Sequence, residues 1–242
     1  MINGLKLILI SLQASIMVVP AAAADDEQAL VNTYLERWDD ESLKLLGHLA
    51  DCVAEKHPDA ADAFVRNASD STALAKDQDR LVDTDCIKQY WFRSSRTNVD
   101  PDMYRSMLGE ALLKRAHAKD RLPAISEVRM SFDRPRLPQV PISEVHPYYR
   151  DMFVIDRVAG ELAQYSECLA RSQPDGALAV TSTKRGSGQE TAAIRRIEAA
   201  AVDCIATQPT VNFPSFIRRG NLLLQLYYLT RDAGTPVPPP KS

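Results

Sequence analysis

The sequence predicts an all-α fold. The chain of 242 residues contains only nine glycines, fewer than a protein rich in β-hairpins usually needs. Apolar residues recur at three- and four-residue steps through most of the chain, which is the spacing of one helix face. Its four cysteines form two similar patterns. We therefore expect two related three-helix units, each pinned by one disulfide and packed into one helical body with a proline-rich connector.

The first 24 residues have the features of a signal peptide. Lys6 precedes a mostly apolar run over 7–19, and Ala22 and Ala24 fit the small-x-small pattern at a cleavage site. An uncleaved membrane anchor is the alternative, but polar residues interrupt the run and it is short for a span. We expect a periplasmic or secreted chain that begins near Asp25 and is not transmembrane after processing.

The cysteines predict two disulfides. Cys52 is followed 34 residues later by Cys86, and Cys168 is followed 36 residues later by Cys204; each second cysteine lies in an Asp-Cys-Ile triplet. A Pro-Asp pair begins six residues after Cys52 and again six residues after Cys168. Four cysteines allow three connectivities, and this duplication favours Cys52–Cys86 and Cys168–Cys204. The chain has no CxxC spacing and no histidine at ligand distance, so we expect no metal and no cofactor.

The first unit is expected over residues 25–118. His57-Pro58 ends its first helix, because the residue before a proline avoids the helical region, and Pro101 fits the first turn of its last helix. Three long helices are predicted in this unit, over 27–56, 71–91 and 100–117. A short helix is predicted over 59–66.

A connector follows over 119–145 and contains four prolines, and residues 114–136 form a basic stripe with seven Lys or Arg against three acids. The basic stripe suits an anionic partner or, as we favour, a solvated loop. Residues 128–132 could form a brief extended piece.

The second unit is expected over 146–232. Its first helix carries an apolar stripe that includes Tyr148, Met152, Ile155 and Leu162. A helix over 190–207 and a last helix over 214–231 complete the unit. The last helix is apolar around most of its circumference, which predicts a central, buried position. The proline-rich tail over 233–242 is expected to be disordered.

Charge is unevenly distributed. Residues 25–86 contain 16 acidic and 6 basic side chains, and residues 87–242 contain 16 acidic and 22 basic ones. Such an asymmetry can steer a partner, but it more often reflects solvated helix faces.

No catalytic residues are predicted. The sequence lacks the nucleophile elbow, the zinc-protease motif, the P-loop and the dinucleotide-binding glycines. His48 lies one helical turn from Cys52, as a catalytic pair would, but the predicted disulfide uses that cysteine. The acidic residues between Asp77 and Asp85 lack the glycine and the glutamate of a calcium-binding loop.

Aromatic and arginine residues follow each second cysteine and form the candidate interaction surface. Side chains of these types suit protein or anionic-ligand interfaces, and they equally suit the base of a helical core. The candidate residues are Trp91, Arg93, Phe216, Arg218 and Arg219.

These features favour an exported, non-catalytic binding or interaction protein. Its partner is unknown; an envelope protein or an anionic ligand would fit, and we expect no nucleic acid. The alternative is an envelope enzyme with an unrecognised site that acts on an anionic substrate through Arg93, Arg218 or Arg219.

Overall fold

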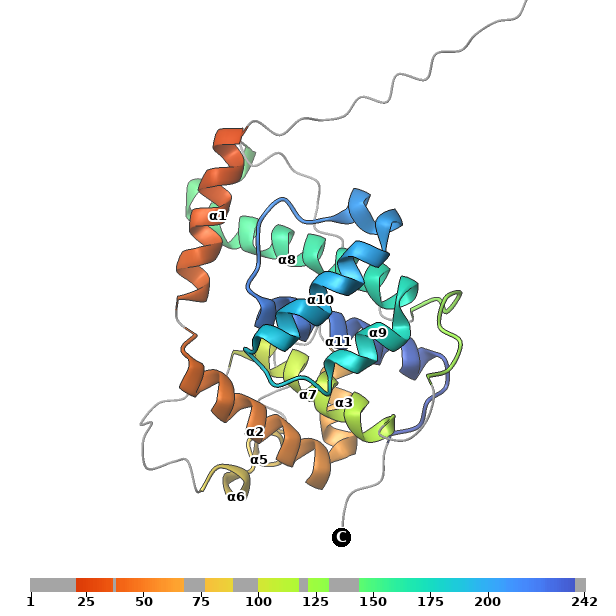
Figure 1. Ribbon diagram of the computed structural model, residues 1–242. Coiled ribbons are helices and arrows are strands. Elements are labelled where there is room, and N and C mark those ends of the chain that lie inside the picture. The colour runs from red at the N-terminus through yellow and green to blue at the C-terminus, as the bar shows by residue number, and fades with distance from the viewer. Residues whose placement is uncertain are drawn as a thin grey trace, which may run out of the picture.

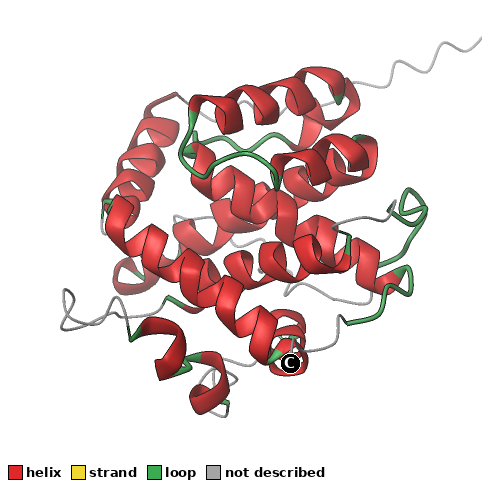
Figure 2. Ribbon diagram, turned by 60° about the horizontal axis from the view of Figure 1, so that its bottom comes forward, coloured by secondary structure: helices red, strands yellow, loops and turns green. Residues whose placement is uncertain are grey.

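The computed structural model describes residues 21–36, 38–67, 77–88, 100–117, 122–130 and 144–237. All regular elements in these ranges are helices, and no strand occurs in them (Figure 1, Figure 2). The predicted all-α fold is confirmed. The helices are α1 (Ala21–Leu35), α2 (Asp40–Lys56), α3 (Pro58–Arg66), α5 (Gln78–Leu81), α6 (Thr84–Ile87), α7 (Pro101–Ala116), α8 (Pro147–Ser172), α9 (Pro174–Val180), α10 (Gly188–Ala200), the 3-10 helix η3 (Val202–Thr207) and α11 (Ser215–Asp232).

Proline residues lie at the junctions that follow α2 and α8. His57 ends α2 and Pro58 occupies the first turn of α3. In the same way, Gln173 ends α8 and Pro174 occupies the first turn of α9. Proline lacks the N–H that a first-turn residue does not need, so it starts a helix without loss. Each long helix is therefore followed at once by a short one.

Both predicted disulfides are confirmed. Cys52 in α2 is bonded to Cys86 in α6, and Cys168 in α8 is bonded to Cys204 in η3. The Cα atoms are 5.7 Å apart in each pair, within the range that a disulfide requires. Each bond thus fastens a long helix to a short helical segment that precedes a central helix.

The centre of the molecule is the crossing of α7 and α11 (Figure 1). α7 also packs against α2 and α3, whereas α11 packs against α8, α9 and α10. Small side chains allow the two central helices to approach closely. A Cβ atom built on Gly220 would lie 2.8 Å from Ser106 Oγ, and one on Gly109 would lie 2.9 Å from Leu224 Cδ1. The predicted central position of the last helix is confirmed by the burial of every residue from Leu222 to Thr230.

The prediction of one helix over 27–56 is wrong. The chain leaves helical geometry between α1 and α2, where Asp39 has an extended backbone and its side chain accepts a hydrogen bond from the N–H of Ser42. This N-cap, with Asp40 and Glu41 in the first turn of α2, is a start signal inside an apparently continuous apolar pattern. α1 is therefore a separate helix with its own packing.

The second predicted helix, over 71–91, is also interrupted. Within the described part, α5 and α6 are each a single turn, and Asp83 caps α6 by accepting a hydrogen bond from the N–H of Asp85. The remainder of that predicted helix lies outside the described residues. Each half of the chain thus contains more helical elements than the three expected.

Further differences occur in the second half. The helix predicted over 190–207 ends at Ala200 and is followed by the separate helix η3. The apolar stripe of α8 is only partly buried, because the side chains of Tyr148 and Met152, near its start, are 80% and 61% exposed.

Only parts of the connector and the tail are described. Residues 122–130 and 144–146 contain no α-helix and no strand, and the last described residues of the tail, 235–237, have no regular structure. The rest of the connector, including most of its basic stripe, lies outside the described residues.

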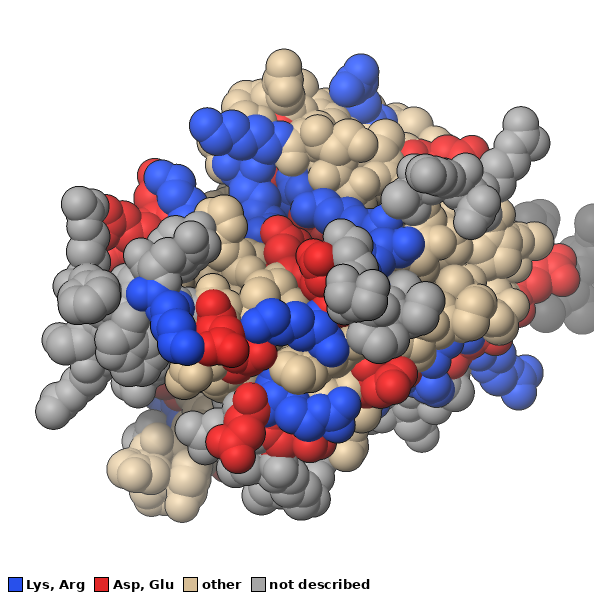
Figure 3. Space-filling model, turned by 90° about the horizontal axis from the view of Figure 1, so that it is seen from below, with Lys and Arg blue, Asp and Glu red and all other residues tan. Residues whose placement is uncertain are grey.

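On the face that Figure 3 shows, the bottom of Figure 1, positive and negative side chains are interspersed. The unequal charge of the two parts of the sequence therefore does not produce a patch of one sign on this face. Among the described helices, none has both the length and the apolar character that crossing a membrane requires.

Replacing both cysteines of either disulfide with alanine should destabilise the fold by about 4 kcal/mol, because closing a loop of this length restricts the unfolded chain. Urea unfolding of the Cys52→Ala/Cys86→Ala and the Cys168→Ala/Cys204→Ala proteins measures this loss. A variant as stable as the wild type would show that the bond does not restrict the unfolded state as assumed.

Gly220→Ala should destabilise the protein by about 1–3 kcal/mol, because the new methyl group overlaps Ser106 and pushes the central helices apart. Gly160→Ala is the matched control. A Cβ atom at Gly160, within α8, meets nothing within 4 Å, so that change should be neutral or stabilise the helix by up to about 1 kcal/mol. Equal effects at both sites would contradict the close crossing.

Candidate ligand pocket

The structure separates the residues of the predicted interaction surface. Trp91 and Arg93 lie outside the described residues. Phe216 is half-buried and packs against the main core, and Arg218 is half-buried with its Nη1 2.7 Å from Glu198 Oε1. Arg219 is only 2% exposed. The prediction of a surface role for Arg219 is corrected, because its guanidinium lies inside the protein.

Arg219 is held by two buried carboxylates. Its Nε and Nη2 donate to the two oxygens of Glu110 in α7, at 3.0 and 2.8 Å, and its Nη1 donates to Glu190 Oε2 in α10, at 2.9 Å. Nη1 also donates to the hydroxyl of Thr183, at 2.8 Å. The positive charge of Arg219 is therefore compensated internally, which argues against its use on an anionic substrate.

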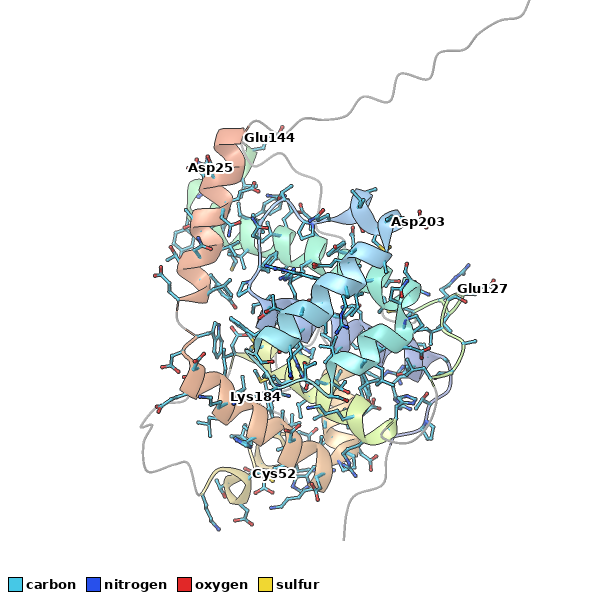
Figure 4. The ribbon with its side chains drawn as sticks, in the orientation of Figure 1. Asp25, Cys52, Glu127, Glu144, Lys184 and Asp203 are labelled. Atoms are coloured by element: carbon cyan, nitrogen blue, oxygen red, sulfur yellow. A yellow bond between two sulfur atoms is a disulfide. The ribbon has the colours of Figure 1, made fainter. Side chains whose placement is uncertain are left out.

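The loop between α9 and α10 completes this buried network. Arg185 donates from Nε to Glu110 Oε2 at 3.2 Å. Its guanidinium also lies against α2, where a Cβ atom on Gly47 would overlap it. Figure 4 labels the neighbouring Lys184, which lies close to α2 and α7. Gly186, with φ +71°, makes the turn that lets its N–H donate to Glu190.

The buried network controls the ionisation of Glu110. Burial by itself would raise the pKa of this carboxyl, but the hydrogen bond from Arg219 and the charges of Arg185, Arg219 and Lys114 lower it to about 2. Glu110 is thus ionised in the folded protein at every ordinary pH.

Breaking the network should cost much more than breaking the neighbouring ion pair. Arg219→Gln removes the ion-pair partner of the buried Glu190, leaves Glu110 with only Arg185 and Lys114, and should destabilise the protein by about 3–5 kcal/mol. Arg218→Gln, one residue away, removes a half-exposed pair and should cost about 1 kcal/mol or less. Chemical unfolding of both variants measures the difference, and equal losses would contradict the central role of Arg219.

Acid should remove the contribution of Glu110. Because the folded state holds this pKa below its ordinary value of 4.5, the stabilisation is present above pH 4.5 and is lost as the pH falls toward about 2. Urea unfolding between these pH values should show a steeper loss for the wild type than for Glu110→Gln. Parallel pH profiles would exclude Glu110 as a source of acid sensitivity.

A cavity of about 260 Å³ lies between α1, the start of α7, α8 and α11. Most of its wall is apolar. Every one of these four helices contributes, and so does the segment that precedes α11. Apolar side chains of the wall include Val31, Leu35, Val158, Leu162, Phe213 and Leu224.

α1 closes one side of this cavity. Val31 of α1 packs with Val154, Val158 and Val211 in a small apolar cluster that is separate from the main core. Polar contacts hold the helix at three places: an ion pair joins Glu27 to Arg157, Gln28 exchanges two hydrogen bonds with the backbone of Asn212, and the hydroxyl of Tyr34 donates to Asp100 at 2.8 Å. The wall formed by α1 is therefore attached to α8, to the start of α7 and to the segment before α11, and not to the main core.

Polar groups of the cavity gather at the first turn of α7. Asp100 caps this helix by accepting hydrogen bonds from the N–H groups of Asp102 and Met103. Arg105 is 5% exposed, its Nη1 is paired with Asp102, and its guanidinium lies 4.8 Å from the ring centre of Phe64. Both the cap and the arginine are thus engaged within the protein.

Asp156 of α8 completes the polar end. Burial and, secondly, the negative charge of Asp102 raise the pKa of its carboxyl. No hydrogen bond or ion pair of Asp156 is formed with another described residue. The cavity therefore combines an apolar interior with one carboxylate that lacks a counter-charge in the described part of the protein.

This arrangement is suited to binding. The described wall contains one serine, Ser106. Its hydroxyl donates to the carbonyl oxygen of Met103 in its own helix, at 2.8 Å. The candidate pair of Cys52 and His48 is excluded, because Cys52 is in a disulfide. No cluster of metal-ligating side chains occurs among the described residues.

None of the residues predicted as a surface lines this cavity. Two features of the sequence belong to this site: the apolar stripe of α8 that includes Ile155 and Leu162, and the acidic start of α7. The sequence could not show that they meet, since residues far apart in the chain form each wall. Comparison of the chain with protein-family models, with curated proteins and with solved structures found no match.

Proposed function

We propose that this protein is an exported, non-catalytic binding protein that holds a small apolar molecule in the cavity between α1, α7, α8 and α11. The observation that carries the proposal is the cavity itself, about 260 Å³ with a mostly apolar wall. Ligand sites are typically concave, mostly apolar and equipped with a few polar groups that orient the ligand. The cavity fits this description.

The size of the cavity favours a small ligand. Pockets for drug-sized molecules measure roughly 300–1,000 Å³, so this cavity lies just below that range. A single short alkyl chain or one ring system is the occupant that we infer. Burying such a group yields roughly 25 cal/mol per Å² of apolar surface.

The cavity is open on part of its surface, and we infer that α1 is the wall that moves when a ligand enters. Its apolar contacts belong to the small cluster of Val31, Val154, Val158 and Val211, not to the main core. Displacement of α1 would open the cavity while both disulfides and the crossing of α7 and α11 remain intact. This favours a helix that opens and closes over the ligand.

Export is supported by the two disulfides, because such bonds persist in oxidising compartments. Cleavage after Ala24 would leave the part of α1 that lines the cavity, including Val31, Tyr34 and Leu35. The proposed processing and the proposed binding site are therefore compatible.

We also infer that the two halves derive from one duplicated unit. α2 contacts α3, α6 and α7, and α8 makes the corresponding contacts with α9, η3 and α11. If the N-caps Asp100 and Pro214 are taken as equivalent positions, the buried Arg105 corresponds to the buried Arg219. Ser106 then corresponds to Gly220, and these two residues are in contact.

Filling the cavity should abolish binding. Ala163 lines the cavity and is half-buried, so Ala163→Phe should occupy the space of the ligand, whereas Ala192→Phe on the exposed side of α10 should not. Titration with 1-octanol, followed by methyl NMR, should give saturable shifts in Val158 and Leu162 for the wild type and the control. Absence of saturable shifts in the wild type, or their persistence in Ala163→Phe, would reject this site.

A further inference from the structure

We propose that the ligand of this cavity carries one positive charge, an alkylammonium group that binds to Asp156. This inference deepens the proposed binding function and rests on it. It assigns the apolar part of the ligand to the interior and the ammonium group to the polar end, next to the first turn of α7.

The charges of the wall favour a cation. Three carboxylates line the cavity, from Asp100, Asp102 and Asp156, against the single guanidinium of Arg105. Arg105 is already paired with Asp102. An anionic ligand would have to compete with that pair and approach two further carboxylates, which opposes its binding.

The three carboxylates are not equivalent. Asp100 is occupied as a helix cap and as acceptor of the Tyr34 hydroxyl, and Asp102 is occupied by Arg105. Asp156 alone among them forms no hydrogen bond or ion pair with another described residue. Its neighbour in the chain, Arg157, does not neutralise it, since that side chain is paired with Glu27 and Glu161.

The position of Asp156 at the rim of the cavity places a bound cation next to the apolar interior. Asp156 lies exposed at this rim, within electrostatic range of Asp102, and partial desolvation together with that negative charge raises the pKa of its carboxyl. An ammonium group removes this repulsion and donates charge-assisted hydrogen bonds. The apolar chain of the same ligand then covers the interior side chains.

The test compares three probes with the same chain length: octylammonium, 1-octanol and octanoate. Near neutral pH the wild type should bind octylammonium about tenfold more tightly than 1-octanol, as expected for one charge-assisted hydrogen-bonded pair, and octanoate most weakly. Asp156→Asn should bind octylammonium and 1-octanol within about threefold of each other. Asp151→Asn, an exposed carboxylate of α8 that does not line the cavity, should retain the wild-type preference.

The outcomes separate this inference from the proposed function. If 1-octanol binds as tightly as octylammonium, or octanoate binds best, the cation is excluded and the apolar site stands. If Asp156→Asn folds as judged by circular dichroism and keeps the preference, Asp156 is not the group that recognises the charge. If no probe binds in a saturable way, the proposed function fails as well. Acidification should weaken only octylammonium binding, since Asp156 then becomes protonated.

Discussion

The packing of α7 against α11 depends on a charged interaction at its centre. Arg219 bonds both oxygens of Glu110 across the two helices and reaches Glu190 in α10. A buried ion pair of this kind adds little stability compared with apolar side chains of the same shape, but it is costly to break. It therefore fixes the relative position of the helices rather than simply holding them together. Gly220 and Ser106 allow the close approach that this geometry needs.

The cavity follows from the same constraint. The crossing fixes the start of α7 and the adjoining turns of α11, while α8 packs along α11. Among the described residues, α1 and the segment that precedes α11 cover part of the space that these three helices leave beside the first turn of α7. A small apolar cluster, separate from the main core, joins α1 to α8 and to the segment before α11, so the wall that we propose to move is attached apart from that core. Such a division suits a protein that must admit a ligand and then enclose it.

Much of the fold could be predicted from the sequence because its signals are local. Pro58, Pro101, Pro147 and Pro174 mark helix starts, and the repeated cysteine spacing gave the correct disulfides. The sequence prediction missed the break before α2, because the apolar spacing across the break is that of one long helix. The capping residue Asp39 was nevertheless recognisable in the sequence. The periodicity of apolar residues shows which face of a helix is apolar, but it does not show where a neighbouring helix ends.

The candidate site was much less predictable than the fold. Arg219 has the composition of a surface residue, and only its two partners, contributed by residues 29 and 109 positions away, make it a core residue. Asp156 is one acid among many in the sequence, and its importance depends on the absence of a partner in the described structure. Both properties arise from long-range packing, which spacing and composition do not encode.

The central claim is that a ligand lies between α1 and the main body, with its apolar chain inside and its charge at Asp156. Intermolecular nuclear Overhauser effects from octylammonium to the methyl groups of a labelled protein test this placement directly. The account predicts contacts from the end of the chain to Val31, Val158 and Leu162. Contacts confined to the exposed start of α8, at Met152, or spread over unrelated methyl groups, would contradict it.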